Sequence, residues 1–258
     1  MKPSEVAYNK IQSIYSNASS VLVIHCSRQN LTDNDGGLST PRIITIKVKS
    51  LDGRINSTFA IHLEAEKLKI IWEEIENYYD QLEGRVLGEF NKFVSDYREY
   101  TWIHWDMDGI HFGFEAIRHR YCVLVDSEGK DYCEVPIEKR VNINALLKDI
   151  YSDNYENEPM MENLMKSNNN GSHKHGFMTI EEEALAFKRR DFPKILESVQ
   201  CKVSFLADVI GKTVSRRLNV SNKNFLYRLG LFFAHPIMVA IAWIIGVVGF
   251  IISLFCMG

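Results

Sequence analysis

The chain has 258 residues, of which 46% are hydrophobic and 24% charged, and this balance excludes a largely disordered protein. The formal net charge of −3 conceals an asymmetry, because the last acidic residue is Asp208 and every charged residue after it is basic. The acidic character of the preceding part argues against non-specific nucleic-acid binding there. Five scattered cysteines without a C-x-x-C pair indicate a reducing compartment and argue against a structural zinc site. They are Cys26, Cys122, Cys133, Cys201 and Cys256.

The first part of the chain predicts three strands. After an amphipathic stretch from Val6 to Tyr15, the run VLVIHCS (21–27) has the continuous apolar character of a buried central strand. RIITIKVKS (42–50) and INSTFAIHLEA (55–65) flank the dipeptide Asp52-Gly53, which is a strong hairpin signal. We therefore expect an antiparallel meander.

Helices and further strands follow. Helical spacing of apolar residues predicts helices over 64–82 and 86–97, and the alternation in TWIHWDMD (101–108) predicts a fourth strand. GFEAIRHRYCVL (113–124) predicts a helix, YCEVPI (132–137) a last strand, and VNINALLKDIY (141–151) a helix beginning at Asn142. This order indicates an α/β fold with a mixed sheet and helices on its faces.

A polar loop over 167–176 ends at the capping box formed by Thr179 and Glu182, which predicts another helix. The neighbouring acidic run Glu181-Glu182-Glu183 suits the first turn of that helix. An amphipathic helix is expected over 192–214, directed towards a membrane. We divide the chain into an α/β domain (1–165), a helical extension with a basic end (166–228) and a membrane anchor (229–258).

The anchor is predicted from hydrophobicity. Residues 229–257 carry no charge, and the 22 residues from Pro236 to Met257 are enough for one helix to cross a bilayer. The alternative is a buried core helix of a soluble protein. Because basic residues precede the run and no charge follows it, we expect a single pass through the cytoplasmic (inner) membrane with the folded part in the cytoplasm. The first twenty residues also lack the apolar core of a secretory signal. The orienting basic residues are Lys212, Arg216, Arg217, Lys223 and Arg228.

Small residues recur within this hydrophobic run. Ala242 with Gly246, and Gly249 with Ser253, are small-x-x-x-small pairs, a spacing that lets helix backbones approach closely. We therefore expect the segment to be capable of self-association, which would make the protein a homo-oligomer.

The order of elements over 21–150 resembles the RNase H-like fold of the DEDD proofreading exonucleases. In that family an Asp-x-Glu at the end of the first strand binds two metal ions, and the matching positions here are His25-Cys26-Ser27. The resemblance implies a second carboxylate at Asp106 or Asp108 and a third at Asp149 or Asp153. Since the first pair is missing, we expect no metal cofactor and no nuclease activity. The alternative is a Mg²⁺ or Mn²⁺ site built on Asp106, Asp108 and Asp149.

Two further stretches carry a second resemblance. WIHWDMDGIHFGFEAIRHRY (102–121), and GFMTIEEEALAFKRRDF (176–192) with CKVSFLADV (201–209), look like domains of bacterial anti-phage defence operons. These include retron-type systems in which a membrane protein is the toxic effector. The resemblance implies a protein or nucleoprotein partner, such as a reverse transcriptase with its nucleic acid.

One polar and aromatic cluster is a candidate pocket for a nucleotide, a metal ion or a stacked RNA base, although aromatic residues at a strand end also simply pack. Its members are Trp102, His104, Trp105, His111, His119 and Arg120, beside Asp106 and Asp108. His173 and His175 could hold a metal only with other ligands. GxSxG, P-loop and GxGxxG motifs do not occur in the sequence, so the enzyme classes that depend on them lose support.

The sequence thus leads to three hypotheses. The first is a non-enzymatic membrane-anchored effector or interaction protein, whose cytoplasmic domain binds a partner and whose membrane helix clusters to perturb the bilayer. The second is a membrane-tethered, metal-dependent 3'-5' exonuclease. The third is a passive adaptor that only holds a partner at the membrane.

Overall fold

A five-stranded mixed sheet forms the centre of the protein. The computed structural model describes residues 2–29, 41–109 and 112–221. The strands lie in the order β3-β2-β1-β4-β7. Their bounds are β1 Val21–Arg28, β2 Ile43–Ser50, β3 Asn56–Ala60, β4 Thr101–His104 and β7 Arg140–Asn142. β1, β2 and β3 are antiparallel neighbours, whereas β4 is parallel to β1 and β7 is parallel to β4. The predicted α/β class with a mixed sheet is confirmed.

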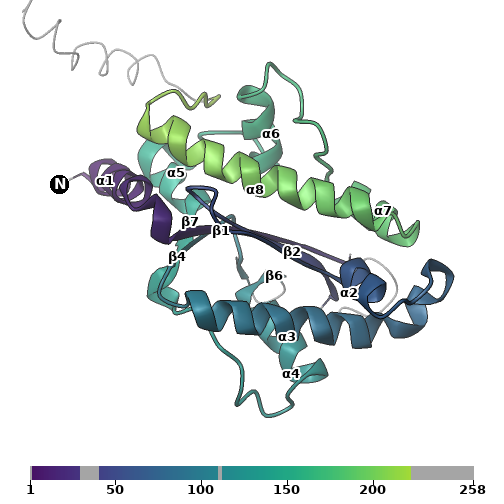
Figure 1. The fold of residues 1–258 in the computed structure, drawn as a ribbon. Coiled ribbons are helices and arrows are strands. Elements are labelled where there is room, and N and C mark those ends of the chain that lie inside the picture. The colour runs from purple at the N-terminus through teal and green to yellow at the C-terminus, as the bar shows by residue number, and fades with distance from the viewer. Residues whose placement is uncertain (1, 30–40, 110–111, 222–258) are drawn as a thin grey trace, which may run out of the picture.

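Helices cover both faces of this sheet (Figure 1). α3 and α4 lie on one face, and α1, α5 and α8 on the other. The helices of the described residues are α1 Pro3–Ser16, α2 Ile61–Lys67, α3 Tyr79–Tyr97, α4 Phe114–Leu124, α5 Ile143–Tyr151, α6 Met160–Ser167, α7 Ile180–Lys188 and α8 Phe192–Val214. Short 3-10 turns span Ala18–Ser20, Trp72–Tyr78 and Ile137–Lys139. A two-residue ribbon, β5 Asp108–Gly109 with β6 Phe112–Gly113, leads from β4 into α4.

The central strand β1 is buried on both sides. Val21 and Val23 pack with α1, α5 and α8, while Leu22 and Ile24 point into the core formed with α3 and α4. Successive side chains of a strand point to opposite faces, so a strand covered by helices on both faces needs apolar residues at almost every position. This is why the run VLVIHCS predicted the strand correctly.

α8 is a main wall of the core. Its 23 residues cross β1 and β2, and its apolar side shares one hydrophobic cluster with α1 and α5. The first and last described helices also meet directly, because the Tyr8 hydroxyl donates a hydrogen bond of 2.9 Å to the carbonyl of Val214. The helix predicted over 192–214 is confirmed, and its apolar side packs on the sheet. The division at residue 165 stays a prediction.

Several predicted boundaries differ from the structure. Residues 132–137 form no strand. The last strand is the three-residue β7 instead, because Val135 and its neighbours pack into the core of α3 and α4 without joining the sheet. The third strand ends at Ala60, where α2 begins, and the helix predicted over 64–82 is divided by a 3-10 turn. β4 ends at His104, because the chain turns at Asp106 with a φ of +48°. Gly113 allows the following ribbon to close, since a Cβ there would lie 2.0 Å from the carbonyl oxygen of Met107.

The predicted anchor, residues 229–258, lies outside the described residues, as do Lys223 and Arg228. The helix-packing residues Ala242, Gly246, Gly249 and Ser253 lie there as well. Among the helices of the described residues, none combines the length and the apolar character needed to cross a bilayer.

Candidate functional site

A cavity of about 340 Å³ lies at the carboxyl ends of β1 and β4, bordered by α6, α7 and α8. In open α/β sheets this edge is the usual place for ligands. β1 contributes His25 to Arg28, and the residues after β4 contribute Trp105 and Asp106. The remaining lining residues are Phe112, Glu158, Pro159, Met160, Met161, Glu162, Phe177, Met178, Thr179, Ile180, Glu181, Glu183 and Lys202.

A buried ion pair forms one wall of the cavity. The Lys202 ammonium on α8 lies 2.6 Å from Glu183 Oε1 on α7. The Ser198 hydroxyl donates to the same oxygen at 2.7 Å, and the Ser27 hydroxyl donates to the other carboxylate oxygen at 2.8 Å. Lys202 and Glu183 are each only 5% exposed. The carboxylate therefore has three donors, and the two charges cancel in a place that water barely reaches.

His25 and Cys26, at the end of β1, are both uncharged at pH 7, because burial shifts their pKa values. Burial, and secondly the Lys202 charge, lower the pKa of His25 to about 3, so its imidazole is neutral at pH 7. Its Nδ1 atom has no hydrogen-bond partner among the described residues. Burial also raises the pKa of the Cys26 thiol to about 12, which leaves it protonated and a poor nucleophile.

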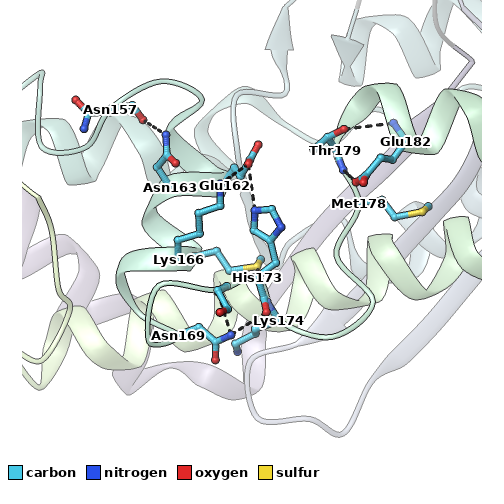
Figure 2. A network of polar contacts seen from close by, with 12 residues as sticks. Asn157, Glu162, Asn163, Lys166, Asn169, His173, Lys174, Met178, Thr179 and Glu182 are labelled. Atoms are coloured by element: carbon cyan, nitrogen blue, oxygen red, sulfur yellow. Dashed lines mark hydrogen bonds and ion pairs between the residues drawn. The ribbon is translucent and has the colours of Figure 1, made fainter.

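Another wall consists of α6 and the end of the loop that joins it to α7. Figure 2 shows Lys166 and His173 converging on Glu162, at 2.7 Å and 3.1 Å. The Asn169 side chain holds the loop by donating to the carbonyl of His173. Thr179 and Glu182 form the predicted capping box, which fixes the start of α7. These contacts hold the wall in a defined position.

Asp106 and Asp108 accept hydrogen bonds from amide side chains. The Asn142 side-chain nitrogen lies 2.9 Å from Asp106 Oδ1 and 3.0 Å from Asp108 Oδ2. Asn144 donates to the second oxygen of Asp106 at 2.8 Å and accepts a hydrogen bond of 2.6 Å from the Tyr155 hydroxyl. Asn142 also caps α5, as its predicted position at the start of that helix requires. In the described part of the chain, no group of three His, Cys, Asp or Glu side chains is arranged to hold a metal ion.

His104 stabilises the turn after β4. It is fully buried, and its Nδ1 accepts a hydrogen bond of 3.1 Å from the backbone N–H of Met107. The proton of the neutral ring is therefore on Nε2, which faces Asp108 at 3.4 Å. Burial lowers the pKa of His104 to about 4, although Asp108 and Asp106 oppose this shift.

The structure does not gather the six residues predicted as one pocket. Trp105 lines the cavity, whereas Trp102 is fully buried on the other face of the sheet against Phe90 and Phe93. The alternation of β4 explains this separation. Arg120 is bound to the buried Glu83 at 2.5 Å.

The remaining predicted residues lie elsewhere. His119 is exposed on α4, and His111 lies outside the described residues. Asp149 is exposed on α5 and does not line the cavity, and Asp153 is exposed as well. His173 and His175 are paired with Glu162 and Glu197. Of the predicted orienting cations, Lys212 donates to the carbonyl of Asn168, and Arg216 lies over the Tyr8 ring. Arg217 follows the end of α8.

Glu183 and Lys202 were not predicted from the sequence as site residues. The sequence contains a signal for Lys202, because this residue falls in the helical series Ile195, Val199, Leu206 and therefore lies on the side of the helix that faces the core. A lysine at such a position requires a buried partner. Glu183 lies three and four residues before the buried Ala186 and Phe187 and was assigned only to the charged first turn. The pairing itself depends on how α7 packs on α8.

Comparisons with protein-family models, with curated proteins and with solved structures find no match to this chain.

The position of Asn142 between two carboxylates leads to a test. Asn142→Asp keeps the helix cap but places a third carboxylate there, so we expect the free energy of unfolding without metal to fall by about 1 kcal/mol. Adding about 10 mM Mn²⁺ should restore about 1–2 kcal/mol in this variant. Urea unfolding monitored by tryptophan fluorescence measures both effects. Asn142→Ser, which keeps only the cap, is the control. A variant that responds to Mn²⁺ no more than the wild type would contradict the described convergence of Asp106 and Asp108.

Proposed function

We propose that this protein is a membrane-anchored, non-enzymatic binding protein of bacterial anti-phage defence. Its folded part is an RNase H-like domain that has lost metal-dependent cleavage and binds a protein or nucleoprotein partner. The RNase H-like assignment is supported by the strand order β3-β2-β1-β4-β7, with β1 to β3 antiparallel and β4 and β7 parallel to β1. The anchor and its cytoplasmic orientation are supported by the sequence of residues 212–258.

The observation that carries the proposal is the pair of Lys202 and Glu183 beside Ser27. The resemblance to the exonucleases expects metal-binding carboxylates at the end of β1, where this chain has His25 and Ser27. A buried ammonium bound to the nearest carboxylate opposes the entry of two divalent cations there. The side chains at the end of β1 therefore do not fit a two-metal centre. The cavity above the pair remains available for binding.

Toxicity would come from the anchor. A single membrane helix is harmless when dilute or held by a partner, and clustering brings the small residues of neighbouring helices together. Ala242, Gly246, Gly249 and Ser253 would line the contact. The competing proposal is a tethered nuclease, which is favoured by one fact: Asp106 and Glu183 line the same cavity.

One preparation of membranes from cells expressing the full chain tests the proposal. The protein should resist extraction with alkaline carbonate, and after solubilisation in a mild detergent it should leave labelled single-stranded and double-stranded oligonucleotides intact in Mg²⁺ or Mn²⁺. Asp106→Ala is the matched control for any residual cleavage. Metal-dependent degradation that disappears in Asp106→Ala would establish the nuclease instead. Full release by carbonate would refute the anchor. Unchanged oligomer size and toxicity after Gly246→Leu would refute clustering.

A further inference from the structure

The chemistry around the cavity restricts what can occupy it. Five carboxylates and two cations line the cavity. One cation, Lys202, is already bound to Glu183, and the other, Arg28, lies 4.9 Å from the centre of the Phe112 ring. His25 adds no charge, because burial lowers its pKa. The net charge of the lining is therefore negative.

Not all of these carboxylates are equally available. Glu162 is paired with Lys166, and Asp106 accepts hydrogen bonds from two amides. Glu158 and Glu181 are exposed, and neither has an ion-pair partner among the described residues. Glu158 accepts only a backbone hydrogen bond, from Met160. These two side chains leave negative charge at the cavity that a ligand can neutralise.

The rest of the lining is apolar and adaptable. Met160, Met161 and Met178 line the cavity together with aromatic rings. Methionine side chains are flexible and polarisable, so they can fit apolar groups of different shapes. Ile180, also in the lining, is 59% exposed and offers a further apolar contact. The buried Nδ1 of His25, another lining residue, has no hydrogen-bond partner among the described residues.

We propose that the cavity binds a basic, apolar peptide segment of a partner protein. A bulky apolar side chain enters among the methionines, and neighbouring Lys or Arg side chains pair with Glu158 and Glu181. A volume of about 340 Å³ accommodates one such side chain with part of its backbone. Nucleic acids are disfavoured, because their phosphates would meet the exposed carboxylates. This inference rests on the proposed binding function and names the kind of partner.

The test uses the full chain in detergent and two degenerate pools of labelled dodecapeptides. Both pools carry random Leu, Ile, Phe and Trp at the same apolar positions, and they differ only in having Lys and Arg, or Asp and Glu, at the charged positions. We expect the basic pool to bind at least about tenfold more tightly in fluorescence anisotropy, with an affinity that falls as salt rises. Equal binding of the two pools, or no binding of the basic pool, would overturn the inference.

Variants locate the binding. Glu158→Gln with Glu181→Gln should weaken binding of the basic pool roughly tenfold, at about threefold per charge. Glu128→Gln with Glu138→Gln is the control, because it removes the same charge from exposed positions outside the cavity lining. Ile180→Ser, at an exposed position, should also weaken binding and separates the apolar contribution from general charge attraction. Equal losses in the cavity and control variants would refute the assignment to this cavity.

Failure of the peptide-binding inference can be distinguished from failure of the proposed function. If a labelled oligonucleotide binds instead of the peptides, and Ile180→Ser weakens it, the inference falls while a non-enzymatic binding domain stands. If the same preparation cleaves the oligonucleotide in Mn²⁺, the proposed function itself falls.

Discussion

Lys202→Met is expected to lower the free energy of unfolding by about 3–5 kcal/mol, because it leaves the Glu183 charge buried without its ion-pair partner. The two serine donors to Glu183 remain, but they cannot replace an opposite charge at 2.6 Å. Urea unfolding of the detergent-solubilised protein at pH 7, followed by tryptophan fluorescence, measures the loss.

A double variant separates the charge from the packing. Lys202→Met combined with Glu183→Gln removes both charges. Ser27 and Ser198 contact different oxygens of Glu183, so the glutamine oxygen accepts from one hydroxyl and the glutamine NH2 donates to the other. We therefore expect most of the lost stability to return. Lys92→Met is the surface control, since its pair with Glu89 is largely exposed and should contribute less than about 1 kcal/mol. A double variant no more stable than the single one would show that Lys202 contributes mainly through packing.

The stability of the protein is expected to fall as the pH is lowered from about 6.5. The unfolded chain binds protons at His25 and His104 near pH 6.5, whereas the folded protein does so only near pH 3 and pH 4. Burial is the main cause of both lowered pKa values. Because the unfolded state takes up the protons first, each histidine costs about 1.4 kcal/mol per pH unit within its window. The pKa of His62, also lowered by burial, acts in the same direction.

Urea midpoints at pH 7, 6 and 5 test this prediction, since the two histidines together should give a slope of about 2.4 kcal/mol per pH unit between about pH 6 and pH 5. Above pH 5 few carboxylates titrate, so the histidines dominate the slope. His25→Leu should lower the slope by about 1.2 kcal/mol per pH unit, whereas His119→Gln, at an exposed position, should leave it unchanged. Constant stability from pH 7 to pH 5 would contradict the neutral, buried state of both rings.

The elements best predicted from the sequence are those in which a local pattern alone determines the structure. β1 follows from an uninterrupted apolar run, α7 from its capping box and α8 from its helical stripe. β7 was not predicted, because a strand of three residues is too short to show an alternating pattern. The stretch 132–137 just before it is more apolar and was predicted as the strand instead. The 3-10 turn Trp72–Tyr78, between α2 and α3, was likewise missed, because its apolar residues continue the helical spacing of the segments on either side.

The candidate site was only partly predictable. Trp105 and Asp106 were identified from the chain, and His25 to Ser27 were recognised as the positions that lack carboxylates. The grouping of Met160, Met161 and Met178 in the cavity lining, and the pair of Glu183 with Lys202, depend on how α6, α7 and α8 pack around the strand ends. Such contacts join residues far apart in sequence, and local patterns do not specify them.

The packing of α1 against α8 has a consequence for biosynthesis. A ribosome makes α1 first and α8 only after most of the described chain, yet both helices belong to one hydrophobic cluster over β1. The sheet face formed by Val21 and Val23 therefore lacks the cover of α8 while the nascent chain grows, even after α1 and α5 have been made, and the domain can close only once residue 214 has emerged. Until then, we expect chaperones to bind the apolar residues of this face that remain exposed.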